Sequence, residues 1–145
     1  FCDYSMKNRT YRYAENNILY PFGYGLTYYQ VECSDLTYSD KKVSLSVTNT
    51  GNTDTEDVVQ IYIKGYSENA VPNYSLCGFK RVSLKKGETQ KIELMLDESA
   101  FEVVDKNGIR KVEGNKFMLF AGTSQPDELS EKLTGTKCLS LEINI

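Results

Sequence analysis

The sequence of 145 residues contains no histidine and no tryptophan. The absence of histidine excludes Ser-His-Asp and Cys-His catalysis, the HExxH zinc site and an imidazole pH switch. No apolar run approaches the ~20 residues of a membrane-spanning helix. A strong charge excess is also absent, since 17 Lys and Arg stand against 20 Asp and Glu, a net charge of -3. We therefore expect neither a nucleic acid nor a membrane as a partner.

Cysteine pairs of the CxxC type are absent as well. The four cysteines lie far apart, at Cys2, Cys33, Cys77 and Cys138, whereas structural zinc sites usually take their ligands in close pairs. We predict no metal and no cofactor. Cys33 and Cys77 fall within strand-like patterns, where a free thiol behaves as a small hydrophobe. Four free thiols are therefore favoured over two disulfides, and a cytoplasmic location slightly over a secreted one.

Apolar and polar residues alternate with a period of two along most of the chain after Tyr28. This period places one face of each strand in a core and the other face towards solvent or a neighbour. Asn107-Gly108 separates two such runs and is a strong hairpin signal. Strands spaced by roughly 8–12 residues with Gly and Asn turns indicate an all-β antiparallel sandwich of the immunoglobulin type. The alternating apolar residues are Val43, Leu45, Val47, Val59, Ile61, Ile63, Ile92, Leu94, Leu96, Phe117, Leu119, Ala121, Leu139, Leu141, Ile143 and Ile145.

Two segments depart from this pattern. Residues 126–133 predict a helix of one or two turns, with Pro126 at its start and Leu129 and Leu133 four residues apart. Residues 1–30 hold seven of the 11 tyrosines and show little periodicity. An irregular segment rich in aromatic and arginine residues is typical of a surface that packs on a partner, although it could equally wrap its own domain.

Acidic residues lie in polar turns, at 54–57 and 127–128. Glycosidic cleavage needs two carboxyl groups across a bond, one with its pKa raised in an apolar pocket. Nothing in a hydrophilic turn raises a pKa, so we interpret these acids as solvated. A calcium loop over residues 49–57 has the oxygen donors Asn49, Asn52, Asp54 and Asp57 but lacks the EF-hand spacing. A solvated turn is the favoured interpretation.

The longest irregular connection, residues 65–77, carries Tyr66 and Tyr74. Exposed tyrosine rings can stack on sugars, so these two residues are candidates for a carbohydrate contact. Tyrosine at an interdomain contact or a core edge is the favoured interpretation, because no tryptophan accompanies them.

Residues 8–13 read NRTYRY and residues 20–28 read YPFGYGLTY. They resemble, in the same order, two elements of family 3 glycoside hydrolases (β-glucosidases, β-xylosidases and relatives): a GRTYRY run, which closes the second catalytic domain, and a YPFGYGLSY element. Residues 47–51, 57–63 and 78–88 resemble the family's C-terminal fibronectin type III-like domain. Cys77 stands where the family usually has Lys or Arg, and Gly108-Ile109-Arg110 replaces a hairpin that contains tryptophan.

The resemblance implies a fibronectin type III-like sandwich over residues 28–145, preceded by the tail and linker of a catalytic domain over residues 1–27. The parent enzyme would remove β-linked sugars by a retaining mechanism whose carboxylates lie in other domains, so no residue of this chain is assigned a catalytic role. The start of the chain, without an initiator Met, also reads as the interior of a longer protein. The expected role is an accessory domain, with a free-standing sugar-binding or adhesive sandwich as the alternative. Its expected partners are the parent's catalytic domains, through which any oligomer would form. The expected interdomain contacts are Arg9, Tyr11, Arg12, Tyr13, Phe22 and Tyr24, and Tyr66 and Tyr74 are candidates for the active-site rim or a sugar contact.

Overall fold

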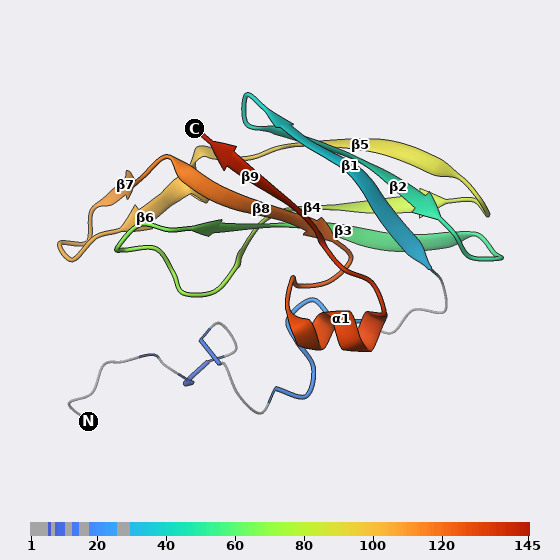
Figure 1. The fold of residues 1–145 in the computed structure, drawn as a ribbon, viewed down its shortest axis with the longest axis horizontal. Coiled ribbons are helices and arrows are strands. Elements are labelled where there is room, and N and C mark those ends of the chain that lie inside the picture. The colour runs from blue at the N-terminus through green and yellow to red at the C-terminus, as the bar shows by residue number, and fades with distance from the viewer. Residues whose placement is uncertain (1–5, 7, 11–12, 15–17, 26–29) are drawn as a thin grey trace.

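The structure is a computed structural model that describes residues 6, 8–10, 13–14, 18–25 and 30–145. The described chain forms an antiparallel β-sandwich (Figure 1). Its elements in chain order are β1 (Val31–Ser39), β2 (Lys42–Asn49), β3 (Thr55–Gly65), β4 (Ser75–Leu84), β5 (Thr89–Met95), a 3-10 helix η1 (Glu98–Phe101), β6 (Glu102–Val104), β7 (Arg110–Val112), β8 (Lys116–Gly122), α1 (Glu128–Thr134) and β9 (Leu139–Asn144).

Two main sheets face each other across the core. One sheet has the strand order β1-β2-β5 and the other has the order β4-β3-β8-β9, while β6 and β7 form a separate hairpin. All strand pairs are antiparallel. The prediction of an all-β antiparallel sandwich is therefore confirmed, and the expected hairpin turn at Asn107-Gly108 joins β6 to β7.

The period-two pattern fills the space between the sheets. Every predicted apolar run contributes to the buried core, which includes Val43 and Leu45 of β2, Val59 and Ile61 of β3, and Leu119 of β8. Ile145 is the exception, because it lies beyond β9 and is exposed. The predicted short helix is also present as α1, with the Asp127 side chain as its N-cap and Gly135 in the left-handed conformation at its C-terminus.

A fully buried amide fixes one corner of the sandwich. Asn49, at the end of β2, donates from Nδ2 to the carbonyls of Thr53, Leu84 and Lys85 at 2.8, 3.3 and 3.1 Å, and its Oδ1 accepts from Gly51 N at 2.9 Å. This single side chain therefore ties the β2–β3 turn to the end of β4. Its polar atoms form hydrogen bonds with the backbone of the same chain.

The two outer faces of the sandwich differ in chemistry. The outer face of the β1-β2-β5 sheet carries mostly small polar and charged side chains, including Ser34, Ser46 and Lys91, which pair across the strands. The outer face of the β4-β3-β8-β9 sheet carries Phe79, Gln60 and Tyr62 and, on β8, Phe120. Segment 18–25 and α1 lie on the side of this second sheet (Figure 1).

Candidate functional site

The segment that precedes the sandwich is anchored to the outer face of β3 through Gly23. Gln60 Nε2 donates to the carbonyl oxygens of Gly23 at 3.3 Å and Thr123 at 3.1 Å, and Tyr62 OH donates to Gln60 Oε1 at 2.6 Å. Gly23 has a φ of +76°, and a Cβ atom built on it would lie 2.4 Å from Gln60 Oε1. Only glycine fits this backbone conformation and this approach without a shift.

The two polar side chains of this anchor are buried. Gln60 is 8% exposed and Tyr62 is 1% exposed, although both point away from the core. Burial raises the pKa of Tyr62, and the nearby Cys138 and Asp127 raise it further. The phenol therefore stays protonated over the physiological range and keeps donating to Gln60, whose amide is then oriented towards Gly23 and Thr123.

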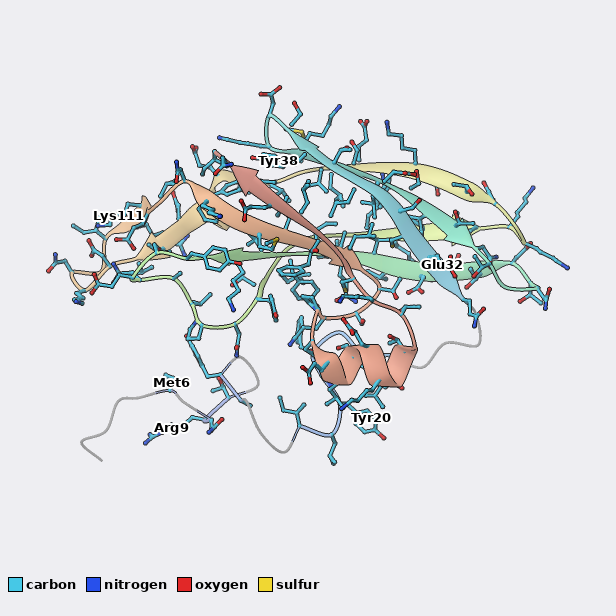
Figure 2. All side chains as sticks on the ribbon, in the orientation of Figure 1. Met6, Arg9, Tyr20, Glu32, Tyr38 and Lys111 are labelled. Carbon is cyan, nitrogen blue, oxygen red and sulfur yellow. The ribbon has the colours of Figure 1, made fainter. Side chains whose placement is uncertain are left out.

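An aromatic surface surrounds the anchor. The rings of Tyr20 and Tyr24 stack with centroids 5.5 Å apart and an interplanar angle of 14°. Tyr20 is 69% exposed and Phe22 is 45% exposed. Phe79, which pairs with Gln60 from the neighbouring strand β4, is 66% exposed. Figure 2 shows Tyr20 on the side of the molecule where α1 lies. Large exposed aromatic groups in one region are typical of a surface that contacts another protein.

The expected interdomain residues are only partly described by the structure. Phe22 and Tyr24 flank the anchored Gly23, and Tyr13 lines a groove beside the loop that follows β3. Arg9 lies in a turn whose backbone N–H donates to the carbonyl of Met6 at 3.0 Å. Tyr11 and Arg12 lie outside the described residues.

The loop between β3 and β4 is held by side chains of the sandwich. Tyr74 packs edge-on against Phe120 with centroids 5.0 Å apart, and Lys64 Nζ lies 5.2 Å from the centre of its ring. Burial raises the pKa of Tyr74. Tyr66, by contrast, is 57% exposed. Of the two tyrosines proposed for a sugar or rim contact, Tyr66 therefore presents the freer ring.

A carboxylate on the β7–β8 connection fixes the same loop. Glu113 accepts from Asn69 N at 3.2 Å and from Asn69 Nδ2 at 3.0 Å, and hydrogen bonding by the Asn69 side chain lowers the pKa of Glu113. Lys106 pairs with Glu68 at 3.0 Å between exposed side chains. The loop is thus pre-formed, which reduces the entropy lost when it contacts a partner.

The acidic residues at 54–57 serve local structure, and Glu56 and Asp57 lie on β3 rather than in a turn. Asp54 Oδ1 accepts from Lys86 N at 2.9 Å, and Asp57 Oδ1 accepts from Val58 N at 2.7 Å. Burial raises the pKa of Asp57, against the donation from Val58. The interpretation of the acids at 54–57 as solvated is therefore wrong for Asp57, because β3 places its side chain partly out of water. Within the part of the chain that the structure describes, no group of three or more His, Cys, Asp or Glu residues is arranged to hold a metal ion.

The described cysteines Cys33, Cys77 and Cys138 are free thiols. As expected from the strand pattern, Cys33 and Cys77 pack against the hydrophobic core. Burial raises the pKa of both thiols to about 12 and that of Cys138 to about 11. These thiols are therefore almost entirely protonated at neutral pH and are poor nucleophiles.

Sequence reasoning missed the anchor itself. Gln60 alternates with Val59 and Ile61 and was expected to face solvent or a neighbour, with nothing to single it out. Two features of the sequence indicate the anchor. Gln60 and Tyr62 share the outer face of an otherwise apolar strand, and a glycine lies between Phe22 and Tyr24. No helix among the described residues is long and apolar enough to cross a membrane.

The fold and this anchored segment define an immunoglobulin-type sandwich whose outer face holds the chain that leads into it. Comparison with known proteins gives the family. Residues 57–125 match the fibronectin type III-like domain family. This chain therefore carries a fibronectin type III-like domain and matches the C-terminal ~16% of family 3 β-glucosidases and β-xylosidases.

The relatives are much longer than this chain. A xylan 1,4-β-xylosidase of Xylanibacter ruminicola is 36% identical over 141 residues, which cover 92% of this chain and 16% of the relative. A β-glucosidase of Kluyveromyces marxianus is 35% identical over 132 residues, and the chain covers 16% of it. The crystal structure of a β-glucosidase from Kluyveromyces marxianus, 31% identical, superposes with a TM-score of 0.75 over 93% of this chain. The family 3 β-glucosidase of Bifidobacterium adolescentis superposes with a TM-score of 0.73, and the chain covers 20% of it.

Proposed function

We propose that this chain is the non-catalytic accessory domain of a family 3 β-glycosidase. In this proposal the sandwich packs on the catalytic domains that hydrolyse β-linked sugars and stabilises them. The division at residues 27 and 28, between the tail of the preceding domain and the sandwich, belongs to the same proposal. The relatives' names, β-xylosidase and β-glucosidase, support a β-linked glycoside as the substrate class.

One observation carries the proposal, namely the capture of Gly23 by Gln60 and Tyr62. A flexible tether between two independent domains needs no such fit. A buried amide that holds the entering chain fixes the direction in which that chain leaves the sandwich, and hence the place of whatever precedes it. The exposed ring of Tyr20 lies beside this anchor and would become buried when the catalytic domains pack there.

The long loop has a second proposed role. Tyr66 lies on a loop that Asn69 and Glu113 hold in place, and its ring is exposed. In this arrangement the loop could present Tyr66 at the rim of the parent's active site. Tyr74 would support the loop from below through its contact with Phe120.

The test compares the complete gene product, the same product lacking this chain, and the chain alone. We expect the complete protein to hydrolyse an aryl β-xyloside or β-glucoside and the chain alone to show no turnover. We expect the version without the chain to unfold at a lower temperature in scanning calorimetry, because it loses the packed interface. Tyr20→Ala in the complete protein should also lower the unfolding temperature, whereas Met95→Ala, an equally exposed position on the opposite sheet, should not. Turnover by the pure chain, or an unchanged unfolding temperature after its removal, would refute the proposal.

A further inference from the structure

A groove of about 710 Å³ lies beside the loop that follows β3, apart from the Gly23 anchor. Its walls come from this loop, the start of β4, η1 and the β6–β7 hairpin, which lies at the end of the molecule marked by Lys111 in Figure 2. The residues that line it include Tyr13, Val71, Pro72, Leu76, Val104 and Arg110.

Three polar side chains of the groove already have partners within the chain. Asn69 donates to Glu113, Asp97 accepts from Ser99 N at 2.9 Å, and Arg110 lies 3.8 Å from Glu102. A sugar needs hydrogen-bonding groups for its many hydroxyls, and these internal partners leave fewer of them free. Beside these polar groups the groove also offers apolar surface.

This apolar surface comes from two walls. Val104 on β6 is 54% exposed and Leu76 on β4 is 39% exposed. Val71 and Pro72 add apolar surface from the loop between them. Side chains of this kind gain roughly 25 cal/mol for each Å² of surface that a partner removes from water.

One residue of the N-terminal segment lines the groove. Tyr13, one of its lining residues, lies ten residues before the anchored Gly23. The chain accounts for only 16% of the length of the xylosidase and glucosidase relatives, so most of a relative's polypeptide lies outside it. A partner that precedes Tyr13 in the same polypeptide is therefore delivered to the groove by the chain itself.

We propose that this groove is a second docking site, filled by an apolar side chain on a loop of the parent's catalytic domains. The proposal rests on the accessory function proposed above and adds to it a contact separate from the Gly23 anchor. The lining holds two carboxylates, Asp97 and Glu102, and one guanidinium, Arg110, so its net charge is negative even though Arg110 lies beside Glu102. The inserted apolar side chain therefore has a Lys or Arg beside it.

Hydrogen–deuterium exchange tests this contact in the complete protein. We expect amides of residues 69–76 and 102–104 to exchange at least about tenfold more slowly in the complete protein than in the chain alone. Val104→Asp in the complete protein should abolish this protection, and Leu76→Asp should do the same from the other wall. Met95→Asp, at an apolar position 67% exposed on the opposite sheet, should leave it unchanged.

The outcomes separate this inference from the accessory function. If residues 18–22 gain protection in the complete protein and the groove does not, the docking site is wrong while the accessory function stands. If neither region gains protection, both fail. If xylotriose or cellotriose, added to the chain alone, shifts the amide signals of residues 69–76 and 102–104 in NMR spectra, the groove is a carbohydrate site and the docking proposal is overturned.

Discussion

Gly23 offers the sharpest test of how the entering segment is held. A methyl group in Gly23→Ala would lie 2.4 Å from Gln60 Oε1 and 3.0 Å from Tyr62 OH, and the backbone there has a φ of +76°. Alanine in the left-handed region costs roughly 1–2 kcal/mol. Displacing Gly23 also breaks the hydrogen bond from Gln60, whose net contribution is about 1 kcal/mol. Docking of residues 18–25 should therefore weaken by about 2–3 kcal/mol, which is roughly 30- to 150-fold in the opening equilibrium.

Hydrogen exchange of residues 18–25 in the isolated chain measures this opening directly. Two glycines supply matched controls. Gly25 has no atom within 4 Å of a built Cβ, so Gly25→Ala should leave exchange unchanged. Gly87 has a φ of +73° and equally open surroundings, so Gly87→Ala reports the backbone cost without the steric one and should not affect residues 18–25. Unchanged exchange of residues 18–25 in Gly23→Ala would refute the anchor.

Three further predictions concern the sandwich itself. Asn49→Ala should lower the free energy of unfolding, measured by urea denaturation, by about 3–4 kcal/mol, because buried carbonyls lose their donor. Thr48→Ala, on the exposed face, should lower it by under about 1 kcal/mol. Equal losses in the two variants would contradict this prediction. Asp57→Asn should raise the unfolding temperature at pH 7, because the raised pKa means that the charged form disfavours folding. The gain should shrink as the pH falls and vanish below about pH 3, where the aspartate is protonated in both the folded and the unfolded state. A gain that persists there would argue against a charge effect. Glu113→Gln should speed amide exchange in residues 66–74 without changing the exchange of β2, because Asn69 loses its charged acceptor. In the unmodified chain, lowering the pH through the depressed pKa of Glu113 should also speed exchange in residues 66–74.

The strands were predictable because burial imposes a period that the sequence must repeat. Val59, Ile61 and Ile63 alternate with polar or amphipathic residues. In a two-layer sandwich this alternation determines which face of the strand lies in the core. The β6–β7 turn was predictable for a local reason, since Asn107-Gly108 suits a tight hairpin. Local rules of this kind depend on neighbours in sequence, so they need no knowledge of the tertiary structure.

The anchor and the corner were not predictable by the same reasoning. The sequence favours a solvated turn at Asn49, with a calcium ligand as the lesser alternative. The side chain is instead 0% exposed and bonds to the end of β4, 35 residues away. Gln60 is likewise a polar residue whose partner, Gly23, lies 37 residues earlier. Contacts across such separations carry no period, because they depend on which surfaces the fold brings together.

Within the proposed accessory role, the difference between the two outer faces predicts which of them the catalytic domains cover. Solvent tolerates the serines and lysines of the β1-β2-β5 sheet, whereas Phe79, Tyr20 and Phe22 stand exposed on the other side at 66%, 69% and 45%. An isolated sandwich gains nothing from such rings, since each leaves apolar surface in water. Because these rings lie beside the anchored Gly23, the entering chain arrives on the side that exposes the most aromatic surface. The same side would therefore face the catalytic domains, with the β1-β2-β5 sheet turned to solvent.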